Sequence, residues 1–345
     1  MKLRYLLVTM LTIGALLYGA LVLFLQVADK METPISSVTI SEKISVKDTI
    51  AIEKTEDIKP VETAVETPKI DTIVPVAKEI ISEEREPEAI VITKSIPASN
   101  LYDANVLEQI VKKYEIVNAE NWGEKIPGIV YKVNAPRNNN RIIFLTFNAY
   151  TKDYPELFNF LIEHKIKSTL FLTGVWVRNN SEQAMALGEL SSLFEIENHG
   201  NKNIALSSNA ATAYGRTGTE NLSEAISEVV NGAAAIKNAT GRTPRYIRSF
   251  INYADNVVVG ALSAASIQTI GFTVTGDGGG NFGSETIKNQ ILNASSGSII
   301  LLNINPEYPN ILEGLKAAIE EIEKEKLAIQ FEQLAEYEQY FEYIQ

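Results

Sequence analysis

Residues 141–164 read RIIFLTFNAYTKDYPELFNFLIEH and contain one complete strand and helix unit. The apolar run at 142–147 is bounded by turn residues and has the length of a buried strand. In the segment that follows, 155–164, the apolar residues fall at helical spacing. Parallel strands need a crossover connection, which is usually a helix. The stretch therefore predicts an α/β fold.

The same unit recurs along the chain as far as residue 331. Further strands are predicted at 169–173, 194–197, 245–248, 271–275, 298–302 and 327–331. Helices are predicted between them at 181–193, 220–239, 256–269, 284–293 and 310–326. Such short repeats imply parallel strands. Both a doubly wound sheet and a barrel satisfy the pattern, so periodicity leaves both open.

Polar residues follow the predicted strands at the points where the strands end. They are Asn148, His199, Arg248, Asp277 and Asn303. The carboxyl ends of parallel strands are the edge at which α/β proteins build their sites. Loops are polar in any case, which is the alternative explanation for any one of these residues. Together they predict a site at one mouth of the domain.

Composition excludes several classes of function. The chain has 345 residues, a net charge of -12 and a pI of about 4.9, so no basic face is available to neutralise phosphates and we expect no nucleic-acid partner. Cysteine is absent, which excludes a thiolate zinc site, a catalytic thiol and disulfides.

The N-terminal 30 residues have the pattern of a membrane anchor. Residues 6–27 are apolar and would span about 33 Å as a helix, against a hydrocarbon core of about 30 Å. A cleavable signal peptide is the alternative, but its apolar region would be shorter. Lys2 and Arg4 favour a cytoplasmic N-terminus. We expect a single-pass membrane protein whose remainder is periplasmic or extracellular.

The rest of the chain divides by composition. Residues 31–100 are rich in charged residues and scattered prolines and carry no sustained period, which predicts a disordered acidic linker. A lead-in segment at 101–140 and a globular domain at 141–345 follow.

Five segments, taken in order, resemble the polysaccharide deacetylases that share the NodB homology domain, carbohydrate esterase family 4. They are IFLTFN (143–148), STLFLTG (168–174), EIENHG (195–200), TGRTPRYIR (240–248) and GSIILL (297–302). WGEKIPG (122–128) and TGDG (275–278) resemble one branch of that family in particular. The resemblance implies a distorted (β/α)7 barrel, here preceded by one transmembrane helix and the linker.

The resemblance also implies metal-assisted removal of acetyl groups from N-acetylated sugars. In such chemistry a divalent metal acidifies water, a carboxylate accepts its proton and a histidine protonates the departing amine. Matched to the family motifs, the base position is Asn148, the metal positions are Ala149, His199 and Asn203, and the acid position is Asn303. A carboxamide cannot act as base or acid and is a weak metal ligand. We therefore expect His199 as the single remaining ligand, without a bound metal; zinc is expected only if the enzyme is active.

Several site residues keep two interpretations. In the family, the arginine at the position of Arg248 contacts the base, and an acidic residue often lies near the acid, as Asp277 would. The alternative is that Arg248 and Asp277 pair with each other and hold the loops. Trp176 and Trp122 could stack on a sugar, or could belong to the core. Asn203 could contact substrate.

Three functions remain open from the sequence. The preferred one is a membrane-anchored, deacetylase-like pseudoenzyme of the cell envelope that binds a glycan such as peptidoglycan, or acts as a scaffold. The second is an active carbohydrate de-N-acetylase whose site is rebuilt from nearby carboxylates, namely Glu195, Glu197, Asp153, Asp277 and Glu307. The third is a purely structural tether of the envelope.

Overall fold

The computed structural model of the protein describes residues 101–136, 139–150 and 152–345. The predicted membrane anchor and linker, residues 1–100, lie outside this range. Within these described residues, no helix is both long and apolar enough to cross a membrane.

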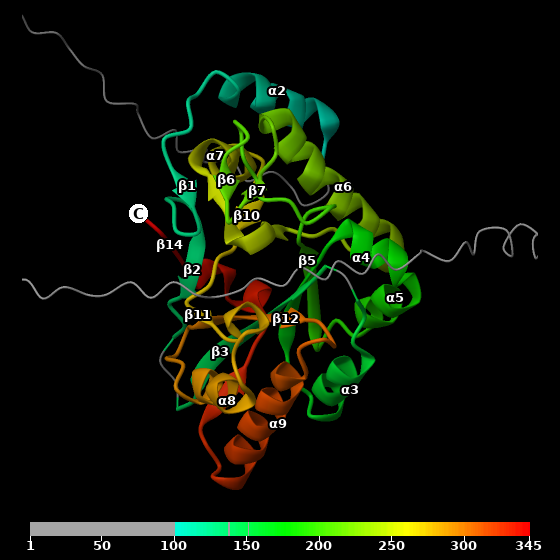
Figure 1. Ribbon diagram of the computed structural model, residues 1–345, viewed down its shortest axis with the longest axis vertical. Coiled ribbons are helices and arrows are strands. Elements are labelled where there is room, and N and C mark those ends of the chain that lie inside the picture. Colours follow the sequence, from blue (N-terminus) through cyan, green and yellow to red (C-terminus); the bar gives the residue numbers. More distant parts are fainter. Residues whose placement is uncertain (1–100, 137–138, 151) are drawn as a thin grey trace, which may run out of the picture. The chain divides into compact units, whose positions relative to one another are not determined.

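A parallel β-sheet organises the described domain (Figure 1). Its strand order is β10 (Gln268–Thr269), β8 (Tyr246–Ile247), β5 (Phe194–Asn198), β4 (Ser168–Leu172), β3 (Arg141–Ala149), β12 (Ile299–Ile304) and β11 (Val274–Thr275). β13 (Ile329–Phe331) pairs in parallel with the start of β3. The predicted α/β class with parallel strands is confirmed.

The sheet forms a partial barrel, because β10 and β11 are its two edges and are not paired with each other in the described chain. The four residues between these strands turn toward β2 (Val130–Val133) instead. The Gly271 amide donates to the Val130 carbonyl at 2.7 Å, and Ile270 forms a bridge with Val130. β2 in turn pairs in antiparallel fashion with β14 (Phe341–Tyr343) near the C-terminus. The lead-in segment is thus an integral part of the domain.

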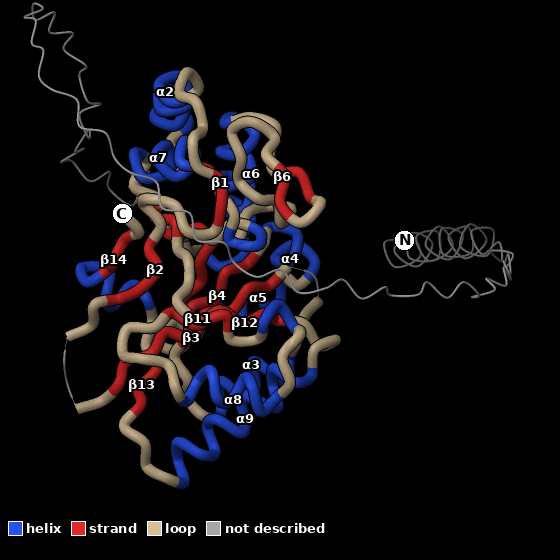
Figure 2. The backbone as a smooth tube through the Cα atoms, turned by 60° about the vertical axis from the view of Figure 1, so that its left-hand side comes forward, coloured by secondary structure: helices blue, strands red, loops and turns tan. Residues whose placement is uncertain are grey.

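Helices cover the sheet. They are α2 (Ala104–Tyr114), α3 (Pro155–Glu163), α4 (Gly174–Asn179), α5 (Ser181–Glu189), α6 (Leu222–Thr240), α7 (Asn256–Ala264), α8 (Ser284–Leu292) and α9 (Pro309–Lys324). Figure 2 shows α3, α8 and α9 grouped together beside β3 and β12. Two short strands, β6 (Thr212–Ala213) and β7 (Arg216–Thr217), form a hairpin between β5 and α6.

Side-chain alternation along β3 places the site residues. Ile143, Leu145 and Phe147 belong to the apolar cluster under the helices, whereas Ile142 and Phe144 belong to the opposite, inner cluster. Because successive side chains of a strand point to opposite faces, Asn148 is on the inner face and Ala149 is on the helix face.

Two predicted boundaries are wrong. The helix predicted at 256–269 ends at Ala264, and 268–269 form β10. Ser266 has a φ of 59°, a left-handed conformation that ends a helix, and this frees the chain to rejoin the sheet. The helix predicted at 181–193 ends at Glu189, and a separate helix, α4, precedes it. Thr173 caps α4, because its hydroxyl accepts a hydrogen bond from the Trp176 amide.

Candidate functional site

The carboxyl ends of the strands open onto a cavity of about 450 Å³. Of the five residues that the sequence predicts at one mouth, Asn148, His199 and Asn303 line this cavity, whereas Arg248 and Asp277 do not. Asn148 and Asn303 are direct register partners on the neighbouring strands β3 and β12. Their exposures are 6% and 8%, so each amide is nearly buried in the wall of the cavity.

Arg248 fixes the orientation of Asn148. One of its terminal nitrogens donates to the Thr146 hydroxyl at 2.8 Å and to Asn148 Oδ1 at 3.3 Å, and the other donates to the Gly271 carbonyl at 2.8 Å. The guanidinium also lies 4.2 Å from the centre of the Phe171 ring. Arg248 is fully buried, and burial lowers its pKa to about 9. Since Asn148 Oδ1 faces Arg248, its Nδ2 is the group left for the cavity.

Asp277 fixes the orientation of Asn303 in the opposite sense. Its carboxylate accepts the Asn303 backbone amide at 2.7 Å and the side-chain Nδ2 at 2.9 Å. Asp277 is fully buried, and burial raises the pKa of its carboxyl. Because Asn303 Nδ2 is engaged, its Oδ1 is left for the cavity. Arg248 and Asp277 therefore each hold a different amide, and the alternative in which they pair with each other is wrong.

His199 is 2% exposed, and its Nδ1 lies 2.6 Å from the Arg248 carbonyl oxygen. Burial lowers the pKa of His199 to about 4, so the imidazole is neutral at neutral pH. A carbonyl partner requires the proton on Nδ1, which leaves the lone pair on Nε2. This is the tautomer of a metal-binding histidine, but a zinc site needs about three protein ligands.

The other implied metal positions do not join His199. Ala149 is fully buried in the apolar cluster on the helix side of β3. Asn203 is not among the residues that line the cavity; its φ is 65° and its Oδ1 is buried without a hydrogen-bond partner. In the described part of the chain, no cluster of three or more His, Asp or Glu side chains could hold a metal ion. The residues present therefore do not fit the family's metal.

Trp176 belongs to the core. Of the two interpretations of this residue, stacking on a sugar and packing in the core, the structure shows the second. Its side chain is fully buried, its ring lies 6.3 Å from that of Phe158, and its Nε1 donates to the Lys152 carbonyl at 3.0 Å. Trp176 cannot reach a sugar in this structure. Neither Trp176 nor Asn203, both expected at the substrate, lines the cavity.

The carboxylates considered for a rebuilt site do not converge on His199. Glu195 accepts hydrogen bonds from the Thr169 hydroxyl at 2.6 Å and the Ala335 amide at 3.1 Å. Glu197 accepts the backbone amides of residues 245 and 246, and Glu307 pairs with Lys152. None of them lines the cavity, and neither does Asp153. Asp277 is occupied by Asn303, as described above.

The sequence analysis missed an aromatic wall of the cavity. It consists of Tyr150, Tyr214, Phe250 and Phe272, with Glu124 at its edge. Glu124 belongs to the 122–128 motif, which was a usable signal. Tyr150 comes from a bend, Tyr214 from a turn, Phe250 from a short 3-10 helix and Phe272 from the segment between β10 and β11, so no common local pattern identified them as lining one cavity.

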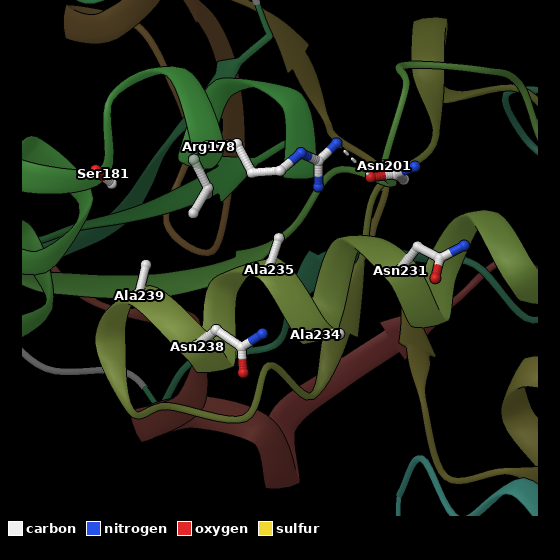
Figure 3. Close-up of a pocket in the computed structure, with 9 residues that line it drawn as sticks. Arg178, Ser181, Asn201, Asn231, Ala234, Ala235, Asn238 and Ala239 are labelled. Carbon is white, nitrogen blue, oxygen red and sulfur yellow. Dashed lines mark hydrogen bonds between the residues drawn. The ribbon is translucent and has the colours of Figure 1, made fainter.

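A second, larger groove of about 600 Å³ lies on the outer surface between α4 and α6 (Figure 3). Arg178 donates to Asn201 Oδ1 at 2.8 Å at one end of it, and Asn231 and Asn238 project from α6 (Figure 3). No residue that the motifs predict as functional lines this groove. The site that the strands build is the smaller cavity.

Comparison with known proteins finds structures with the same fold. No curated protein matches the chain. A mutant of BA3943 from Bacillus anthracis, described as a CE4 family pseudoenzyme with restored enzymatic activity, is 19% identical over 61% of this chain and 71% of that chain, with a TM-score of 0.50. The Bc1960 peptidoglycan N-acetylglucosamine deacetylase is 18% identical over 61% of this chain and 92% of that chain, also with a TM-score of 0.50.

At this level of identity the two structures share the fold with this chain. The sequence match is more specific, since residues 135–270 match the family described as Polysaccharide deacetylase. That range contains β3, β4, β5, β8 and β10, and with them Asn148, His199 and Arg248. Residues 135–270 therefore match the polysaccharide deacetylase family, which is also the family that the sequence motifs resemble.

Proposed function

We propose that this domain binds an N-acetylated glycan of the cell envelope, such as peptidoglycan, without hydrolysing it. The observation that carries the proposal is the opposite orientation of two neighbouring amides. Asn148 presents a donor to the cavity because Arg248 occupies its oxygen, and Asn303 presents an acceptor because Asp277 occupies its nitrogen.

An acetamido group is complementary to this pair. Its carbonyl oxygen accepts a hydrogen bond from Asn148 Nδ2, and its N–H donates to Asn303 Oδ1. Three of the aromatic residues that line the cavity, Tyr150, Phe250 and Phe272, provide apolar surface for the carbon–hydrogen face of the sugar ring that carries this acetamido group. Buried amides held by charged partners distinguish well between acetylated and deacetylated sugars, because a sugar without the acetamido group leaves both amides without a hydrogen-bond partner in the cavity.

The cavity lacks the base, the acid and the full set of metal ligands of the family's hydrolytic mechanism, and the carboxylate that lines it, Glu124, occupies none of those positions. The base and acid positions hold carboxamides, and a neutral His199 is the lone histidine among the lining residues. Two fold relatives support different parts of the proposal: Bc1960, a peptidoglycan N-acetylglucosamine deacetylase, supports an N-acetylated glycan as the ligand, and BA3943, a CE4 family pseudoenzyme, is a precedent for this fold without the usual activity.

We also propose that residues 6–27 anchor the protein in the membrane and that residues 31–100 link the anchor to the domain. The basic residues Lys2 and Arg4 support a cytoplasmic N-terminus, with the domain on the outer side of the membrane. In that position the cavity would meet envelope glycans.

The test is binding with and without acetyl groups. The full chain is titrated calorimetrically with the trisaccharide of N-acetylglucosamine and with its fully deacetylated form. Loss of two hydrogen bonds costs about 1–3 kcal/mol, so the deacetylated sugar should bind about 10–100-fold more weakly.

The same titration is repeated with added zinc and with a chelator, and acetate release is assayed in parallel. We expect the same affinity in both and no acetate. Equal affinity for both sugars would contradict acetamido recognition, and zinc-dependent acetate release that His199→Ala abolishes would show an active, rebuilt site.

A further inference from the structure

The β6–β7 hairpin carries a tyrosine in an unfavourable conformation. Ala213 pairs with Arg216, so the loop between the strands is Tyr214 and Gly215 alone. Their φ values are 50° and 72°. A two-residue loop with both φ values positive is a type I′ turn, whose first position favours asparagine, aspartate or glycine. Tyrosine is a poor choice there, since side chains with bulk rarely adopt positive φ.

Tyr214 is also 77% exposed, so burial of its ring does not compensate for this conformation. Residues held in sparsely populated backbone regions cluster at functional sites, and an observed outlier is grounds for a functional hypothesis. The position of Tyr214 agrees with such a role, because it lines the same cavity as Asn148 and Asn303.

The hairpin is held in place by aromatic residues from other segments. The Tyr214 ring makes an edge contact with Tyr253 at 5.7 Å, and Tyr253 makes another with Trp122 at 5.5 Å. The Trp122 indole donates to the Thr212 carbonyl at 3.3 Å. Arg216 lies over the Phe250 ring at 5.3 Å. The hairpin therefore presents Tyr214 from a fixed position at the cavity.

We propose that the Tyr214 ring is a stacking platform for a second sugar ring, next to the ring whose acetamido group the two amides hold. This inference rests on the proposed glycan binding and adds that the ligand is an oligosaccharide. The two features lie on different elements, since Asn148 and Asn303 end adjacent strands whereas Tyr214 is at the tip of the hairpin. A cavity of about 450 Å³ falls in the size range of drug-sized ligands, which leaves room beyond one ring.

Three variants of the full chain separate stacking from structure. Tyr214→Ala should weaken binding of the N-acetylglucosamine trisaccharide by about tenfold, a typical effect of losing one aromatic contact. It should leave binding of the monosaccharide N-acetylglucosamine unchanged. Tyr214→Phe keeps the ring and should bind the trisaccharide like the unmodified chain.

Tyr214→Asn gives a readout that a purely structural role would not produce. Asparagine suits the turn, so the melting temperature should rise by a few degrees while trisaccharide affinity falls as in Tyr214→Ala. Two results would overturn the platform while leaving the glycan site in place, provided that the unmodified chain binds the trisaccharide. In the first, Tyr214→Ala binds the trisaccharide as well as the unmodified chain does. In the second, Tyr214→Ala loses affinity for the trisaccharide and for the monosaccharide by the same factor. If the unmodified chain binds neither sugar, both proposals fail.

Discussion

Replacing Asn148 by aspartate is expected to stabilise the folded domain by about 1–3 kcal/mol at pH 7, whereas the same replacement at Asn303 is expected to destabilise it by a similar amount. The two positions are register partners on adjacent strands, are almost equally buried and line one cavity. They differ in what each amide contacts, which is a buried cation for Asn148 and a buried carboxylate for Asn303.

At position 148 the cost of burying the cation is already present in the protein. Arg248 is fully buried, and its partners are a hydroxyl, an amide and carbonyl oxygens. A carboxylate at 148 would face this uncompensated charge; two opposite charges at 4 Å attract by about 4 kcal/mol at an effective dielectric of about 20. Desolvation of the new carboxylate removes part of that gain.

At position 303 the new carboxylate would meet Asp277. The Asn303 Nδ2 that now lies 2.9 Å from Asp277 would become an oxygen, so a favourable contact would become repulsion between like charges. The pKa of one of the two carboxyls would then be raised, so that this carboxyl would keep its proton to a higher pH.

The measurement is urea unfolding of the full chain and both variants at pH 7 and near pH 3. The folded pKa of an aspartate at 148 is lowered by Arg248, so its stabilisation is present above the unfolded value of about 3.9 and lost as the pH falls through the folded pKa. The pKa of the pair at 303 and 277 is raised, so that variant should recover stability in acid. If both variants changed the unfolding free energy in the same direction at pH 7, the opposite orientation of the two amides would be contradicted.

The second large expected effect is on the pH dependence of stability, and it comes from two buried glutamates, Glu195 and Glu197. Burial raises the pKa of Glu195 to about 7 and raises that of Glu197 as well, against 4.5 for an exposed glutamate. A folded pKa above the unfolded value means that the folded state binds the proton more tightly. The resulting stabilisation is fully present below about pH 4.5 and is lost as the pH rises toward 7, an effect of about 3 kcal/mol for Glu195.

Glu195→Gln should therefore flatten the dependence of unfolding free energy on pH between 4.5 and 7 and should stabilise the domain at pH 8. Glutamine retains an oxygen for the Ala335 amide, which Glu195 accepts at 3.1 Å. The matched control is Glu307→Gln, which removes an exposed carboxylate; because the hydrogen bond from Lys152 lowers the Glu307 pKa, this change should leave the profile between pH 4.5 and 7 unchanged. A profile that Glu195→Gln leaves as steep as before would show that Glu195 titrates normally in the fold.

The sequence by itself determined the framework and the location of the site. The strand and helix periods predicted β3, β4, β5 and β12. β3, β4 and β12 contain the apolar runs that are typical of buried parallel strands, whereas β5 alternates apolar and polar residues. Parallel strands also bring their carboxyl ends to one edge, so Asn148, His199 and Asn303 could be assigned to one mouth without coordinates. The motifs also resembled the polysaccharide deacetylases, the family whose model matches residues 135–270.

Only the tertiary structure decided which way each group faces. Whether an amide offers its nitrogen or its oxygen depends on Arg248 and Asp277, which are about 100 and 26 residues away in sequence from the amides that they hold. Trp176 in the core and Tyr214 at the cavity have no local pattern that distinguishes them, because burial results from contacts between distant segments. Local sequence sets backbone periodicity, whereas hydrogen-bond direction and exposure are set by whichever distant side chains the fold brings into contact.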